Sequence, residues 1–341
     1  MKAAIYNPYL DTLGGGERYT MAVASALIDN GWQVDIEWKD PEIKNKLEDR
    51  FGINLEEVNF TSDVKRGENY DLCFWVSDGS IPTLRSRKNI LHFQVPFHGV
   101  NGKSLINKMK LFRINRIVCN SNFTKKVIDQ EYGVNSLVIY PPVDTHKIKS
   151  KRKENLILTV GRFSQLKQAK RQDVLIESFK KMFDAGYSDW RFVLAGGVEV
   201  GADEYVKELE KKVGKYPITI IKSPPYIDLI DLYGKAKIFW SAAGYDINEQ
   251  KEPEKVEHFG ISAVEAMVAG AVPLLFEAGG YKEIIRGGEN GFLWDKVSNL
   301  VAQTKKVINN HPLWASVSGA AKLSSEQYGY ERFEKEVSQI I

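Results

Sequence analysis

The stretch EHFGISAVEAM at residues 257–267 sets two carboxylates, Glu257 and Glu265, around the expected start of a helix. Its apolar residues recur at helical spacing, which predicts an amphipathic helix over residues 260–269. The continuous apolar run at residues 272–276 predicts a buried strand directly afterwards. Glu257 therefore precedes the helix, and Glu265 lies within it.

The start of this helix is a predicted anion site. The backbone amides of Phe259, Gly260 and Ile261 would point outward at the positive end of the helix dipole, where a diphosphate could bind. Gly260 lets such an anion approach the backbone closely. We interpret residues 257–267 as part of a binding site for a nucleotide-sugar. The alternative is that Glu265 is a solvated helix residue and Glu257 only a partner of the helix dipole.

The regions on either side of this stretch have an α/β pattern. Short apolar runs alternate with helical patterns, which predicts parallel βαβ units. Expected strands cover residues 3–6, 33–37, 71–76, 89–93, 116–119 and 137–140 in the first half, and 156–161, 191–194, 218–221, 237–241 and 272–276 in the second. Pro141-Pro142 and the basic stretch 144–154 predict a boundary between two Rossmann-like domains, over residues 1–143 and 144–326.

Length and composition exclude several classes of protein. The 341 residues exceed what one core usually supports, and 47 Lys and Arg against 44 Asp and Glu leave a net charge of only +3, so nucleic acid is not an expected partner. Cys73 and Cys119 lie in apolar runs with no metal or disulfide spacing. The first strand begins directly after Met1-Lys2, so we expect a cytoplasmic protein.

A glycine run and a basic loop provide further candidates. Gly14, Gly15 and Gly16 follow the first strand, so they permit a tight turn and expose backbone amides, but the third glycine of the dinucleotide pattern is missing. This run is either a structural turn or a ligand loop. Gly161-Arg162 ends a later strand and precedes Lys167 and Lys170. Such cations at a sheet edge can neutralise a diphosphate without a metal, although a solvated surface is the alternative.

Residues 257–265, together with Gly279-Gly280-Tyr281, resemble the donor-site signature of retaining glycosyltransferases of family four, the glycosyl transferases group 1. The resemblance implies the GT-B fold, in which two Rossmann-like domains with parallel sheets face an interdomain cleft. It implies that Glu257 contacts hydroxyls of the donor sugar and that Glu265 holds the nucleotide ribose. It also favours Lys170 over Lys167, because the family lysine stands about three residues before the aspartate that starts the helix.

The resemblance assigns roles elsewhere in the chain. It implies that Gly15 and Gly16 face the donor diphosphate. The sequence of residues 14–18 is especially similar to that of the family's α-1,2-mannosyltransferases, which act on dolichol-linked oligosaccharide. It implies that His92, at a strand end, lies near the transferring sugar, with His98 as a competing candidate. Residues 327–341 are expected to cross back to the first domain as a helix.

Two further regions are candidates for contact with the nucleotide and with a membrane. Gly196 and Ser223 follow strands of the second domain, at the edge where α/β sheets bind nucleotides. The segment 103–116 mixes apolar residues at helical spacing with lysines and arginines. It is interpreted either as a surface that rests on an anionic membrane or as an ordinary helix with a basic rim.

These observations predict a metal-independent enzyme that moves a hexose from a GDP- or UDP-linked sugar to an acceptor hydroxyl with retention, and mannose is mildly preferred. The acceptor is a glycan or a lipid-linked glycan, met at the inner face of the membrane, and no cofactor besides the donor is expected. Arg162 and Lys170 would hold the departing charge. The alternatives are a nucleotide-sugar epimerase or hydrolase of the same fold, and a non-catalytic glycan-binding module.

Overall fold

The computed structural model describes residues 1–165 and 168–341 and divides into two compact units. Unit 1 comprises Met1–Pro142 and Tyr330–Ile341, and unit 2 comprises Val143–Gly329. The sequence placed these two boundaries after residues 143 and 326, and the units change at 142 and 329. Among the described residues, no helix combines the length and the apolar character needed to cross a bilayer.

Unit 1 is built on a seven-stranded parallel sheet with the order β3-β2-β1-β4-β5-β6-β7. Its strands are β1 (Lys2–Tyr6), β2 (Gln33–Glu37), β3 (Val58–Thr61), β4 (Leu72–Val76), β5 (Lys88–Phe93), β6 (Arg116–Cys119) and β7 (Leu137–Val138). Its helices are α1 (Gly15–Asp29), α2 (Ile43–Phe51), α3 (Leu105–Leu111), α4 (Asn122–Tyr132) and α12 (Tyr330–Ser338), with the short turns η1 (Leu10–Thr12) and η2 (Lys65–Gly67).

Unit 2 is built on a six-stranded parallel sheet with the order β10-β9-β8-β11-β12-β13. Its strands are β8 (Glu154–Val160), β9 (Arg191–Gly196), β10 (Ile218–Lys222), β11 (Ala236–Ser241), β12 (Val272–Phe276) and β13 (Phe292–Trp294). Its helices are α5 (Gln172–Asp184), α6 (Asp203–Val213), α7 (Tyr226–Lys235), α8 (Ile261–Val268), α9 (Tyr281–Ile284), α10 (Val297–Ile308) and α11 (His311–Ser325), with η3 (Pro253–Lys255) and η4 (Glu326–Tyr328).

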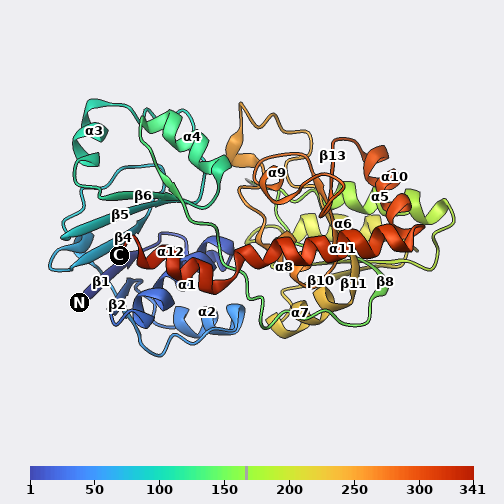
Figure 1. Ribbon diagram of the computed structural model, residues 1–341, viewed down its shortest axis with the longest axis horizontal. Coiled ribbons are helices and arrows are strands. Elements are labelled where there is room, and N and C mark those ends of the chain that lie inside the picture. Colours follow the sequence, from blue (N-terminus) through green and yellow to red (C-terminus); the bar gives the residue numbers. More distant parts are fainter. Residues whose placement is uncertain (166–167) are drawn as a thin grey trace. The chain divides into compact units, whose positions relative to one another are not determined.

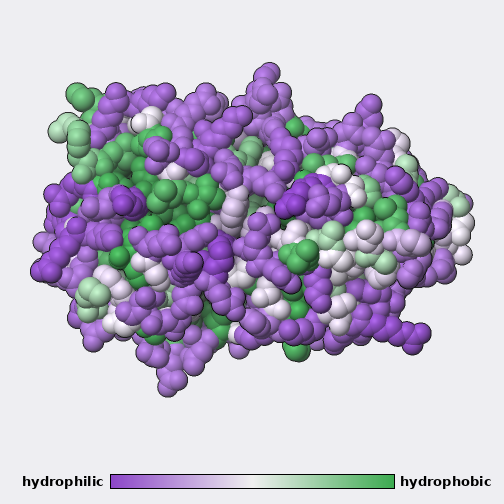
Figure 2. Space-filling view, viewed as in Figure 1, coloured by the Kyte–Doolittle hydropathy of each residue, from purple (hydrophilic) through white to green (hydrophobic). Residues whose placement is uncertain are grey.

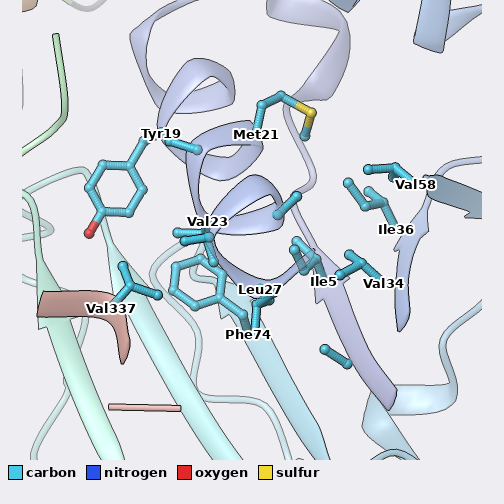
Figure 3. Close-up of a cluster of buried hydrophobic side chains, with 14 of the residues drawn as sticks. Ile5, Tyr19, Met21, Val23, Leu27, Val34, Ile36, Val58, Phe74 and Val337 are labelled. Atoms are coloured by element: carbon cyan, nitrogen blue, oxygen red, sulfur yellow. The ribbon is translucent and has the colours of Figure 1, made fainter. Parts of the chain in front are cut away.

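The core of unit 1 joins the first helix to the last one. Figure 3 shows apolar side chains of α1, the sheet and α12 filling one space, among them Leu27, Phe74 and Val337. In Figure 1, α12 (red) lies beside α1, and Phe333 of α12 packs edge-on against Tyr19 at 5.2 Å between ring centroids. Each such buried side chain contributes about 1.5–3 kcal/mol to folding. The C-terminal segment is therefore part of the core of unit 1.

The two parallel sheets confirm the α/β class, and most differences concern short elements. The strands β3 and β13 and the single-turn helix α9 were missed, because they span only four, three and four residues and carry little periodic signal. Pro312 lies in the first turn of α11, where a missing N–H does no harm, and the break between α10 and α11 falls at residues 309–310.

In each sheet, the strand order reverses direction at one place. In unit 1 this point lies between β1 and β4, and in unit 2 it lies between β8 and β11. Open α/β sheets bind ligands outside the carboxyl ends of the strands at such points. The loops that follow these strands are therefore the first places to look for a site.

Candidate functional site

The centre of the candidate site is an ion pair in unit 2. Nζ of Lys170 lies 2.8 Å from Oε2 of Glu257, and the two side chains are 17 % and 14 % exposed. Lys170 belongs to the loop after β8, and Glu257 precedes α8, so the chain brings together residues 87 positions apart. Gln168 also donates from Nε2 to the carbonyl of Val256 at 3.1 Å, which ties the lysine loop to the same place. Both predicted residues thus share one site.

Glu257 is held as a carboxylate although it is mostly buried. Burial by itself raises the pKa of this carboxyl, but the charge and the hydrogen bond of Lys170 outweigh that effect and leave the pKa below its usual value. A carboxylate that stays ionised can accept hydrogen bonds from hydroxyl groups. Glu257 therefore suits contact with a sugar, provided that Lys170 remains nearby or a ligand replaces it.

A glycine-lined turn fixes the position of Glu257. Gly260 has φ of +107°, and a Cβ there would lie 2.5 Å from Cε1 of Tyr281, so only glycine fits. Gly279 has φ of +57°, and its Cβ would lie 2.1 Å from the carbonyl oxygen of Glu257. The amide of Gly280 donates to that same carbonyl at 2.8 Å. The Gly279-Gly280 pair is thus required for close backbone packing beside the carboxylate.

Tyr281 connects this turn to the sheet. Its hydroxyl lies 2.6 Å from Oγ of Ser241, at the end of β11, and donates a long hydrogen bond of 3.4 Å to Oε2 of Glu257. Burial, and then the charge of Glu257, raise the pKa of Tyr281 well above its ordinary value, so the hydroxyl stays protonated. The sequence included Tyr281 in the resemblance to the donor-site signature but gave this tyrosine no role of its own.

The start of α8 lies next to this turn. Gly260 is the residue before the helix, and Ile261 is its first residue. The ring of Phe259 is buried and packs edge-on against Tyr328 at 5.2 Å, so this residue's apolar part serves the fold of unit 2. The first amides of a helix have no acceptor within the helix, and they carry its positive dipole end. The backbone here has the geometry that the sequence predicted, and binding of an anion stays a prediction.

Arg162 lies at the same edge of the sheet. It follows Gly161 after the end of β8, and a Cβ on Gly161 would lie only 3.0 Å from Cγ of Lys170. The guanidinium of Arg162 has no hydrogen-bonded or ion-pair partner among residues 1–165 and 168–341. It is a positive charge that a ligand could use. The competing candidate Lys167 lies outside the described residues.

The expected nucleotide residues continue this edge. A Cβ on Gly196, the last residue of β9, would lie 2.0 Å from the carbonyl oxygen of Gly161, so the two glycines allow close backbone contact. The amide of Ser223 donates to the carbonyl of Gly196 at 2.7 Å, and Ser223 has φ of +48°. The backbones of Gly161, Gly196 and Ser223 are therefore packed in succession, and Gly161 lies against Lys170.

Glu265 is buried on the inner side of α8, with only 6 % of its surface exposed. Tyr233 of α7 donates a hydrogen bond from its hydroxyl to Oε2 of Glu265 at 2.8 Å. The sequence did not indicate Tyr233, because this residue lies 32 positions before Glu265 in a helix that carries no motif. The tyrosine holds one carboxylate oxygen of Glu265 in place.

The glycine run of unit 1 lies at the carboxyl edge of its own sheet. Gly15 and Gly16 are the first two residues of α1, and a Cβ on Gly16 would lie 2.0 Å from Oε1 of Gln94, just after β5. Asn120, just after β6, donates from Nδ2 to the carbonyl of Gln94 at 3.0 Å. Glu17 accepts from the amide of Gly14 at 2.8 Å and secures the loop. The sequence missed Gln94, which no local motif distinguishes.

The expectation for His92 does not agree with the structure. His92 is fully buried, and its ring stacks on Tyr19 at 4.3 Å and on Phe74 at 5.4 Å. Burial lowers the pKa of its imidazole to about 3, so the ring is neutral. A side chain in the core of unit 1 has no route to a sugar, and contact with the donor is not supported. The competing His98 lies on an exposed loop.

The described parts of the chain contain no group of three or more His, Cys, Asp or Glu side chains arranged to hold a metal ion. The cysteines Cys73 and Cys119 are free and buried, as their apolar surroundings predicted.

Comparisons with known proteins agree with this geometry. Residues 143–323, which are 181 of the 341 residues, match the family described as glycosyl transferases group 1. An uncharacterized glycosyltransferase of Methanocaldococcus jannaschii is 26 % identical over 73 % of this chain and 67 % of its own length. The Dictyostelium discoideum enzyme GDP-Man:Man(3)GlcNAc(2)-PP-Dol alpha-1,2-mannosyltransferase is 22 % identical, and the match spans 64 % of this chain but only 45 % of that enzyme.

The fold has a similar solved structure. HepE of Anabaena, in complex with UDP-glucose, has a TM-score of 0.78 and 17 % identity, and the match covers 99 % of this chain and 98 % of HepE. This likeness confirms the prediction of two parallel-sheet α/β domains of the GT-B kind. The family match lies on unit 2, where Lys170, Glu257 and the start of α8 meet. The chain belongs to the glycosyl transferases group 1 family.

Proposed function

We propose that this protein transfers a hexose from a nucleotide-diphosphate sugar to an acceptor hydroxyl, with retention of anomeric configuration and without a metal. The observation that carries the proposal is the ion pair of Lys170 and Glu257, 2.8 Å apart, beside the start of α8. This arrangement puts a carboxylate for sugar hydroxyls next to positive charge for a diphosphate. Retention is proposed from the resemblance of residues 257–265 to the signature of the retaining family.

The proposed mechanism depends on stabilising the leaving diphosphate. Negative charge grows on the diphosphate as the glycosidic bond breaks and the sugar becomes oxocarbenium-like. Arg162, Lys170 and the amides at the start of α8 supply fixed positive charge at that position. Glu257 orients the sugar, and Glu265, held by Tyr233, accepts hydrogen bonds from the ribose. Gly196 and Ser223 border the nucleotide.

The proposed donor is a GDP- or UDP-linked hexose, and GDP-mannose is the first to test. A named relative uses GDP-mannose, and HepE was solved with UDP-glucose. The proposed acceptor is a glycan or a lipid-linked glycan. A thermal-shift panel of GDP- and UDP-sugars identifies the donor, because a ligand at one hundred times its Kd stabilises the folded state by about 2.7 kcal/mol.

Replacement of the unpaired guanidinium tests the mechanism. Arg162→Ala should reduce kcat of sugar transfer about 100- to 1000-fold, as expected when one donor to a developing negative charge is lost. Arg191→Ala is the matched control, because Arg191 begins β9 at the opposite edge of the sheet and pairs with Glu154 on the surface. It should keep near-normal transfer.

Product analysis separates transfer from the alternatives. The wild-type protein should release little nucleotide from the donor until an acceptor is added. Rapid release of nucleotide without acceptor would support a hydrolase, and near-normal transfer by Arg162→Ala would contradict the assigned role of the arginine.

A further inference from the structure

We propose that α3 and the residue after it, Phe112, form a docking surface for an anionic lipid bilayer. This surface, called here the α3 face, consists of Leu105, Ile106, Met109 and Phe112 with the lysines beside them. The inference adds to the proposed function by stating where the protein would meet a lipid-bound acceptor. It depends on unit 1 alone and needs no contact with the donor residues.

The α3 face is the main concentration of exposed apolar side chains in the described chain. Leu105, Ile106, Met109 and Phe112 are 74 %, 66 %, 64 % and 90 % exposed. They are four of the ten large hydrophobic side chains exposed among the described residues, and α3 has no buried residue at all. Figure 2 shows hydrophobic residues, in green, at the upper left, where Figure 1 places α3, and a larger green area to the right of them. Contiguous exposed apolar surface of this kind marks a contact with another molecule or a membrane.

The arrangement of the side chains fits a bilayer surface. At about 100° per residue, the four apolar side chains fall within an arc of roughly 120°, and Lys108 and Lys110 flank this arc on its two sides. Neither lysine has an ion-pair partner among the described residues. A helix that lies in the plane of a membrane has this pattern, with an apolar face directed toward the acyl chains and flanking lysines at the headgroups.

The charge of the surrounding sequence selects anionic lipid as the occupant. Residues 79–128 contain ten Lys or Arg and no Asp or Glu, although the whole chain is nearly balanced at +3. A protein partner with an apolar groove would not by itself account for fifty residues without an acid. Anionic headgroups attract such a segment, and the attraction weakens as salt is added.

The α3 face is anchored at both ends. Before the helix, Glu131 of α4 accepts hydrogen bonds from the amides of Gly99, Val100 and Gly102 at 3.0–3.2 Å. After the helix, Arg113 donates from Nε to the carbonyl of Leu84 at 2.8 Å. The helix is thus fixed to unit 1 by its two ends while its apolar side chains stay uncovered. This construction keeps the apolar side chains of α3 outside the core of unit 1.

Vesicle flotation with the full chain tests the proposal without donor or acceptor. The protein should float with vesicles of phosphatidylcholine and phosphatidylglycerol, and should bind vesicles of phosphatidylcholine alone at least about tenfold more weakly. The double variant Met109→Ser, Phe112→Ser should lose about tenfold or more in binding. Val200→Ser, Ile227→Ser is the matched control, because these two exposed apolar residues lie in unit 2. It should bind as the wild type does.

Two further variants separate charge from apolar contact. Lys108→Glu, Lys110→Glu should weaken binding to anionic vesicles, and Lys211→Glu, Lys212→Glu on α6 should have a smaller effect. Because both native cysteines are buried, Met109→Cys can be labelled with an environment-sensitive dye, whose emission should shift to shorter wavelength on anionic vesicles. Val200→Cys should show no shift.

The outcomes are distinct. Equal flotation of the wild type and the Met109→Ser, Phe112→Ser variant would overturn the proposal. So would a dimer in sedimentation velocity that this variant dissociates and that vesicles do not compete with, because the α3 face would then bind a second copy. If the wild-type protein floats with anionic vesicles but transfers no sugar, the proposed function is refuted, and the proposal for the α3 face still stands.

Discussion

The carboxyl edges of the two sheets differ in the state of their polar residues. In unit 2, Lys170 and Glu257 remain charged and partly exposed. In unit 1, His92 near the end of β5 is fully buried and neutral, and the nearby amide side chains are buried in Asn120 and half-buried in Gln94. The difference shows that a position near the end of a strand does not make a residue available. Burial by the covering helices decides it.

The alternation of side chains along β5 explains the difference. Side chains of a strand point to opposite faces in turn, so His92 shares a face with Ile90, and both pack with the core of α1 and α12. Both faces of a parallel sheet are usually covered, so only residues beyond the last paired position reach the edge. Gln94 is such a residue. Lys170 and Glu257 lie in loops, where a charge can keep contact with water.

Removal of the cation from unit 2 should give the largest effect. Lys170→Ala should lower the transfer rate about 100-fold or more, and should destabilise the fold by about 3 kcal/mol because Glu257 loses its partner. Lys125→Ala is the control in unit 1, where Lys125 and Asp129 pair at 2.6 Å on α4. It should leave transfer unchanged in a donor-saturated assay. Equal losses in both variants would remove the contrast between the two edges.

Gly260→Ala should have the next largest effect. The methyl group would meet the ring of Tyr281, and the backbone at φ of +107° would be strained, so we expect a loss of about 1–3 kcal/mol in unfolding free energy. Gly201→Ala has a similar φ of +85° with open space around it. It should lose stability from strain alone and keep transfer activity. Denaturant unfolding and kinetics of both variants separate steric displacement of Tyr281 from backbone strain.

The neutral state of His92 predicts a pH dependence of stability in unit 1. Its pKa is about 3 when folded and ordinary when unfolded, so below about pH 6.5 the unfolded state binds the extra proton. The stability it contributes is therefore complete above that pH and falls as the pH drops toward 3, by up to about 1.4 kcal/mol per pH unit.

The measurement is urea unfolding of the wild type and His92→Phe at pH 7, 6 and 5. The wild type should lose more unfolding free energy than the variant as pH falls, because phenylalanine cannot take up a proton. Parallel pH dependences would mean that His92 is hydrated and reachable, and the contrast with unit 2 would disappear.

Gly16→Ala should give the smallest change in stability. Its methyl group would displace only the end of the Gln94 side chain, which can rotate, so unfolding free energy should change by less than about 1 kcal/mol. If the edge of unit 1 takes part in transfer, the KM for one substrate should rise with this variant. Unchanged kcat and KM would mean that Gly15 and Gly16 form a structural turn.

The sequence by itself determined the α/β class with two parallel sheets, and it predicted a domain boundary near Pro142 and an anion-binding edge in the second half. Apolar periodicity and glycines at tight turns are local properties, so they can be read without a structure. The start of α8 and the basic loop after β8 were predicted on this basis, and residues 143–323 match the family that they suggested.

Only the tertiary structure decided which polar residues meet and which are buried. Tyr233 reaches Glu265 across 32 positions, and Lys170 reaches Glu257 across 87, through sheet packing that no local pattern encodes. The same packing enclosed His92 between Tyr19 and Phe74, because α1 and α12 cover that face of the sheet. Local sequence sets the preference of each segment, but the free energy of a polar group depends on the groups that surround it after folding.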